Sequence, residues 1–140
     1  MRDAFKYLTS LLFVTVVVQV ALAGYGAFNA TSKADDNDSV AGKTITDGFT
    51  AHAVVGTIIV ALMVILVLVA LAGRLGRPWV PWSVGLLLLG IAQMLLAWLG
   101  DAVPALGFLH AVNALVIYAG IAMLAHRAFV RRDAAPAAPA

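Results

Sequence analysis

Long runs of apolar residues, separated by short polar stretches, follow one another along almost the whole chain. Four of these runs are long enough to cross the roughly 30 Å hydrocarbon core of a bilayer, which takes about 20 helical residues. They cover Tyr7–Phe28, Phe49–Ala72, Val80–Leu99 and Leu106–His126. The pattern predicts an all-α, integral membrane protein: an up-down-up-down four-helix bundle built from two tandem helical hairpins, in one domain of residues 1–130.

Residues at the ends of the apolar runs are typical of helix starts and stops. Thr46 or Asp47 suits the N-cap of the second helix, and Gly73 suits its end. Pro78 and Pro104 lie where the third and fourth helices should begin, because proline is tolerated in a first turn.

Two polar stretches and the N-terminal segment need separate interpretations. Residues 29–47 are polar and predict an outer loop that is partly disordered or carries a short amphipathic piece, and whose acidic run is solvated. Residues 131–140, rich in alanine and proline, predict a disordered cytoplasmic tail. A cleaved signal peptide over residues 1–23 is an alternative for the first helix, because an Ala-Leu-Ala site ends that segment. The apolar run continues past this site to roughly 22 residues, longer than a signal sequence needs, which favours a retained helix.

The composition fits a chain that lies mostly in lipid. Of the 140 residues, 63% are hydrophobic and 11% are charged, and the mean hydropathy is +0.99. An ordinary soluble domain has roughly 25% charged residues. So little sequence lies outside the membrane that no soluble catalytic domain fits, which argues against an enzyme. The absence of cysteine excludes disulfides, thiolate nucleophiles, iron–sulfur ligation and covalent haem attachment.

The net charge is +2, and the distribution of basic residues predicts the orientation in the membrane. Only Lys33 and Lys43 lie in the first and third connections; the other basic residues lie at the N-terminus, in the second connection and at the C-terminal end. Because cytoplasmic segments carry an excess of lysine and arginine, both termini of this multi-pass, plasma-membrane protein are predicted to be cytoplasmic. Orientation accounts for the positive charge, so no nucleic-acid partner is expected.

The two halves of the chain resemble each other. Gln19 is followed by Val-Ala-Leu-Ala-Gly-Tyr-Gly, and Gln93 by Met-Leu-Leu-Ala-Trp-Leu-Gly. Residues 48–54, Gly-Phe-Thr-Ala-His-Ala-Val, likewise resemble residues 107–112, Gly-Phe-Leu-His-Ala-Val. The first hairpin is therefore expected to recur as the second in the same orientation, which places the second helix diagonally opposite the fourth.

Two histidines, His52 and His110, occupy matching places in this repeat. Both lie about 8–9 Å from the starts of helices that run in the same direction, so they are expected at the same depth. An ionisable side chain inside a bilayer is costly and by default indicates a functional site. On diagonal helices the two imidazoles can supply both axial nitrogens of a haem iron. His126 lies at the other end of its helix without a second histidine nearby, so one haem is expected rather than two.

Five further residues are candidates for the same cofactor site. Gln19, Gln93 and Asn113 place amides at the depth of the histidines, and a ligating histidine usually donates its second ring N–H to such a partner. Gly56 and Ala114 follow the histidines by one turn and leave room for a flat porphyrin. Each group has a simpler alternative, because small residues allow close helix packing and amides link helices by hydrogen bonds without any cofactor.

The placement of His52 and His110 resembles one four-helix half of the haem A synthase family, in which each half carries a histidine on its second and fourth helices. This resemblance implies a b-type haem held by the two histidines. The family places a glutamate beside its helix-two histidine, and this chain contains no glutamate, so oxidation of a haem methyl group is not expected. A closer resemblance is to small uncharacterised four-helix membrane proteins of actinobacteria. It is carried by His-Ala-Val-Val-Gly at 52–56 and His-Ala-Val-Asn-Ala-Leu at 110–115.

These observations predict a membrane protein that holds one bis-histidine haem b near the outer face and transfers electrons to or from a quinone or redox protein. The main alternative is a structural or accessory subunit whose polar layer only specifies helix packing. A third hypothesis, a transition-metal site, would need Asp47 or Asp101 to complete a four-ligand set. Transport of protons or small solutes ranks below these, because no carboxylate lies within a span.

Overall fold

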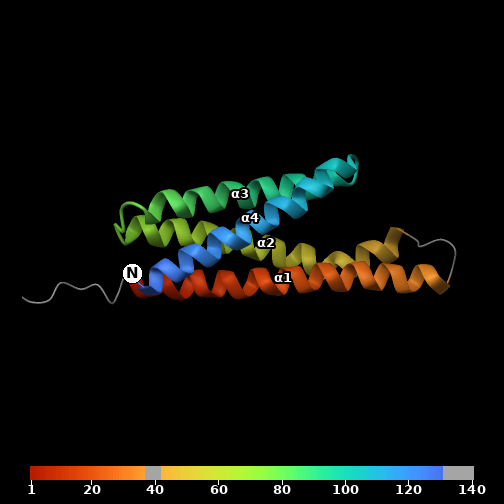
Figure 1. The fold of residues 1–140 in the computed structure, drawn as a ribbon, viewed down its shortest axis with the longest axis horizontal. Helices are drawn as coiled ribbons and strands as arrows, with labels where there is room; N and C mark the ends of the chain where they lie inside the picture. Colours follow the sequence, from red (N-terminus) through yellow and green to blue (C-terminus); the bar gives the residue numbers. More distant parts are fainter. Residues whose placement is uncertain (37–41, 131–140) are drawn as a thin grey trace, which may run out of the picture.

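The chain folds into four long helices. The computed structural model describes residues 1–36 and 42–130, with α1 at Arg2–Asp36, α2 at Gly42–Ala72, α3 at Trp79–Gly100 and α4 at Pro104–Val130 (Figure 1). By length and composition, each of the four could cross a membrane. The predicted all-α fold with four candidate transmembrane helices is therefore confirmed.

The helices form a ring in which each one packs against its neighbours in the chain. α1 contacts α2, α2 contacts α3, α3 contacts α4, and α4 closes the ring against α1. α2 therefore lies diagonally opposite α4, as the internal repeat predicted. One end of the bundle, the termini end, carries the N-terminus, the α2–α3 turn and the end of α4, while the hairpin end carries the α1–α2 and α3–α4 tips (Figure 1).

The prediction of a loop over residues 29–47 is wrong for most of its length. α1 continues to Asp36 and α2 already begins at Gly42. Thr46 and Asp47 are consequently not N-caps but lie inside the first turns of α2. The Thr46 hydroxyl donates to the Gly42 carbonyl at 3.0 Å, and Asp47 forms a 2.7 Å ion pair with Lys43. Hydropathy reveals only the lipid-compatible part of a helix, whereas these turns carry local hydrogen bonds and an i,i+4 ion pair between polar side chains.

The helix ends expected at Gly73, Pro78 and Pro104 agree with the structure, whereas α1 begins at Arg2 and α4 ends at Val130, beyond the expected Tyr7 and His126. α2 ends at Ala72, and the chain then turns through Arg74 and Gly76, whose φ angles are 47° and 67°. α3 begins directly after Pro78, and α4 begins at Pro104. The predicted C-terminal tail and the centre of the acidic run lie in residues 131–140 and 37–41, outside the described residues.

Gln19, His52, Gln93 and His110 lie at one level of the bundle, which we call the Gln–His layer. The packed core of the bundle lies on one side of this layer. Among the described residues, every buried apolar side chain lies between this layer and the termini end: Phe5, Leu12, Val16, Ile59, Met63, Leu66, Ala70, Leu86, Ile117, Ile121 and Leu124. Phe5, Leu12 and Val16 come from α1, so this helix forms one wall of the core. Towards the hairpin end, the α3–α4 tip lies apart from the α1–α2 tip (Figure 1). The buried apolar side chains of the described residues therefore all lie in the half of the bundle towards the termini end.

Candidate functional site

In the first hairpin, Gln19 of α1 and His52 of α2 are joined by two reciprocal hydrogen bonds. The Gln19 side-chain amide donates from Nε2 to the His52 backbone carbonyl at 2.9 Å. The His52 ring lies with Nδ1 3.1 Å from the Gln19 backbone carbonyl. Each residue therefore binds the main chain of the other, and the two side chains lock α1 to α2 at one level.

The second hairpin repeats this arrangement with Gln93 of α3 and His110 of α4. Gln93 Nε2 donates to the His110 carbonyl at 2.9 Å, and His110 Nδ1 lies 3.0 Å from the Gln93 carbonyl. The likeness of the two halves of the sequence is thus matched by the same pair of bonds in three dimensions.

These bonds fix the protonation of both imidazoles at Nδ1. A backbone carbonyl oxygen can only accept a hydrogen bond, so Nδ1 of His52 and of His110 must carry the proton and donate it. In the neutral ring, Nε2 is then left with a lone pair that can bind a metal. The sequence predicted that Gln19 and Gln93 would orient the histidines, and the structure assigns that contact to their backbone carbonyls rather than to their side-chain amides.

The two histidine rings meet across the diagonal of the bundle. Their centroids are 6.3 Å apart, with an angle of 60° between the ring planes. Both residues are half-buried, and the Phe49 ring packs edge-on against His52 at 6.1 Å. The structure therefore brings together the residues that the sequence singled out, at one depth and from diagonal helices.

Asn113 extends the layer on one side only. Its Nδ2 donates to the Leu89 carbonyl at 3.0 Å and to Gln93 Oε1 at 2.6 Å, so it ties α4 to α3 and holds the Gln93 amide in place. The corresponding residue of α2 is Val55, which cannot donate. Gln19 Oε1 is buried and has no hydrogen-bond partner among the residues that the structure describes.

Of the two small residues beside the histidines, Gly56 has a specific packing contact. A Cβ atom at Gly56 would lie 3.0 Å from Gln19 Nε2, so this glycine makes room for the glutamine that bonds to His52. Ala114 occupies the matching place on α4 and is half-buried. The simpler alternative for Gly56, close packing, thus has a specific contact behind it.

Several other candidate residues lie away from the layer. His126 is exposed near the termini end, and Asp101 is exposed at the α3–α4 tip. Asp47 is engaged by Lys43 and does not turn inward. Within residues 1–36 and 42–130, no three potential metal-binding side chains of histidine or carboxylate type come together. The four-ligand metal hypothesis therefore has no support in the described part of the chain.

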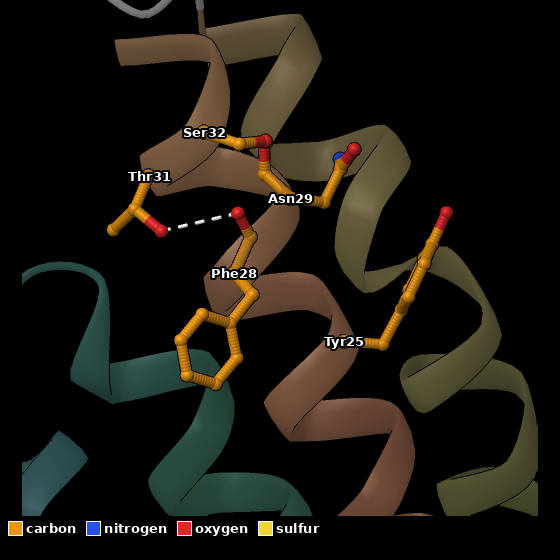
Figure 2. Close-up of a pocket in the computed structure, with 5 residues that line it drawn as sticks. All are labelled: Tyr25, Phe28, Asn29, Thr31 and Ser32. Carbon is orange, nitrogen blue, oxygen red and sulfur yellow. Dashed lines mark hydrogen bonds between the residues drawn. The ribbon is translucent and has the colours of Figure 1, made fainter. Parts of the chain in front are cut away.

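A shallow hollow of about 600 Å³ lies on α1 near the hairpin end, away from the histidines. Its lining comes from α1 alone, and the Tyr25 and Phe28 rings leave the helix on different sides (Figure 2). Thr31 uses its hydroxyl to bond the Phe28 carbonyl of its own helix at 3.1 Å. None of the residues that line the hollow belongs to the Gln–His layer.

The fold and the layer together define an all-α four-helix bundle with four candidate membrane spans and a histidine pair between its diagonal helices. No model of a known protein family, no curated protein and no solved structure matches this chain. Its function must therefore be argued from the site itself.

Proposed function

We propose that this chain is a multi-pass membrane protein that binds one b-type haem between His52 and His110 and exchanges electrons with a quinone or a redox protein. The observation that carries the proposal is the 6.3 Å separation of the two ring centroids. Two imidazole nitrogens on opposite faces of one iron lie about 4 Å apart, which puts the ring centroids roughly 6 Å apart. The spacing therefore suits two axial ligands of one iron.

The hydrogen bonds at Nδ1 support the same proposal. A histidine that binds iron through Nε2 usually donates its other ring N–H to a carbonyl or carboxylate, which fixes the ring and raises its basicity. His52 and His110 each have that partner, at 3.1 and 3.0 Å. The bound haem would supply a one-electron couple, and this chain would hold it at a fixed depth with both ligands neutral.

The position of the layer along the helices determines where electrons could enter. In α1, roughly 20 Å separates Gln19 from Lys6 and also from Lys33, whereas α3 spans only about 8 Å from Gln93 to Trp98, an aromatic residue typical of a membrane interface. The second hairpin therefore favours a layer close to the hairpin end. The basic residues at the termini end favour a cytoplasmic location for both termini in a plasma membrane. The haem would then lie near the outer face, and a quinone or redox protein would have to bring electrons to it there.

A structural role is the second candidate, and the reciprocal bonds favour it. Each Gln–His pair joins the two helices of one hairpin through backbone carbonyls. Interhelical bonds of this kind contribute about 0.6 kcal/mol each on average in a membrane. A subunit without a cofactor would need no further property of the histidines.

Absorption spectroscopy of the purified protein distinguishes the two candidates. Protein from haem-replete cells should show a Soret band and, on reduction, the α and β bands of a six-coordinate haem b. His52→Ala and His110→Ala should each abolish the six-coordinate spectrum, whereas the control His126→Ala should leave it unchanged, because this residue lies exposed at the far end of α4. A preparation that is colourless and stays so on haem titration would establish the structural candidate instead.

A further inference from the structure

The two Gln–His pairs share their bonds but differ in what supports them. Three residues after His110, Asn113 donates to Gln93 Oε1 at 2.6 Å and to the Leu89 carbonyl at 3.0 Å. Three residues after His52 stands Val55, which has no polar atom in its side chain. The four bonds between the histidines and glutamines have similar lengths, between 2.9 and 3.1 Å. The two pairs therefore differ only in whether the oxygen of the glutamine amide has a donor.

The unsupported amide weakens the pair in the first hairpin. Gln19 Oε1 is buried with no hydrogen-bond donor in the described part of the chain, and leaving a buried acceptor unpaired costs free energy. Opening the contact between α1 and α2 at this level exposes Gln19 Oε1 and removes that cost, which offsets part of the loss of the bond from Gln19 Nε2 to the His52 carbonyl. Opening the α3–α4 contact brings no such gain for Gln93, because both the nitrogen and the oxygen of its amide are hydrogen-bonded. The α1–α2 pair therefore opens at a lower cost than the α3–α4 pair.

From this asymmetry we infer that His52 is the exchangeable ligand of the iron and that the position it vacates takes a neutral diatomic molecule, while His110 stays bound. The inference rests on the proposed haem site. With haem bound, the exchange would replace the bond from His52 Nε2 to ferrous iron by a bond from the lone pair of the incoming molecule, with no transfer of an electron or proton. His52 departs as a neutral imidazole with its Nδ1 proton in place.

The surroundings favour a small, uncharged ligand. Next to the layer on its termini side, Ile59, Met63 and Ile117 are 6%, 0% and 4% exposed, so the surroundings there are apolar and shielded from solvent. The helices around the layer could each lie in lipid, where an ion is costly but a gas such as carbon monoxide dissolves readily.

Binding of carbon monoxide to the reduced, haem-loaded protein tests the inference. We expect the unmodified protein to bind the gas, and its bis-histidine spectrum to be replaced by that of a six-coordinate haem with one histidine and one carbon monoxide ligand. Val55→Asn gives α2 the donor that α4 has, and should slow binding about tenfold, the size expected for one buried hydrogen bond. Val55→Thr, close to valine in volume and carrying a hydroxyl donor, is the second variant in case Val55→Asn does not fold. Asn113→Val is the matched control and should accelerate binding, because it removes the donor to Gln93 Oε1 and so weakens the Gln93–His110 pair as well.

Exchange of the Nδ1 protons, followed by NMR of the protein without haem, provides a readout that is independent of the cofactor. The His52 proton should exchange about tenfold faster than that of His110. Val55→Asn should slow exchange at His52 only, and Asn113→Val should accelerate it at His110 only. Equal exchange at the two histidines, or no response of either readout to the Val55 variants, overturns the inference even where a six-coordinate haem is present. Failure to bind haem at all overturns the proposed function, and the ligand site with it.

Discussion

The Nδ1 atom of His52 lies 3.1 Å from the backbone carbonyl of Gln19, and the side chain of Gln19 donates in return to the backbone carbonyl of His52 at 2.9 Å. Each of these two side chains thus donates a hydrogen bond to the backbone carbonyl of the other residue, and the same pair of bonds recurs between Gln93 and His110. Because the acceptors are backbone atoms, the geometry depends on how closely the two helices approach. Packing residues that set this approach should therefore control the histidines.

Gly56 should be required for the first of these pairs. A Cβ atom there would lie 3.0 Å from Gln19 Nε2, so Gly56→Leu must displace the glutamine and separate α1 from α2. We expect a loss of about 1–3 kcal/mol, the usual cost of overpacking, measured as a lower midpoint of thermal unfolding in detergent. Gly24→Ala is the control, because no atom lies within 4 Å of the Cβ position at that glycine. Equal midpoints for the two variants would contradict the role assigned to Gly56.

The two glycines where α3 crosses α4 should respond differently to substitution. A Cβ atom at Gly100 would lie 3.0 Å from Cα of Gly107, and since backbone cannot move aside as a flexible side chain can, Gly100→Ala should force the helices apart. The nearest atoms to a Cβ at Gly107 are 4.0 Å away, so Gly107→Ala should be tolerated. Unfolding midpoints should show Gly100→Ala to be less stable by about 1–3 kcal/mol. A larger loss of stability for Gly107→Ala than for Gly100→Ala would contradict the close approach of Gly100 to the backbone of Gly107.

The orientation in the membrane can be tested with single cysteines, because the chain has none of its own. Ser32 is exposed on α1 near the hairpin end, and His126 is exposed near the termini end. With both termini in the cytoplasm, an impermeant maleimide should label Ser32→Cys in intact cells and His126→Cys only after permeabilisation. The reverse pattern would place the Gln–His layer near the cytoplasmic face and move the expected electron partner to that side.

Much of the architecture follows from the sequence because lipid imposes simple rules. A span needs about 20 apolar residues whatever it packs against, so four runs predicted four helices. Pro78, Pro104 and Gly73 marked helix ends correctly because proline and glycine act on the local backbone. The polar turns of α1 and α2 beyond Phe28 and before Phe49 were missed, since their helicity does not depend on hydrophobic residues.

The sequence by itself predicted that His52 and His110 share a depth, because they occupy matching places in the repeat of the two hairpins. The equal distance expected from the two helix starts is wrong, because α2 begins at Gly42, farther from His52 than Pro104 is from His110. The sequence also predicted, through the repeat of the two hairpins, that Gln19 and Gln93 lie at the depth of the histidines, whereas the pairing of each glutamine with one histidine came from the structure. Only the tertiary structure decided that the ring Nδ1 atoms bind backbone carbonyls, that Gly56 accommodates Gln19, and that Gln19 Oε1 lacks the partner that Asn113 gives Gln93. These features depend on the approach and rotation of helices that are distant in the chain, and the spacing of residues along one helix does not specify either.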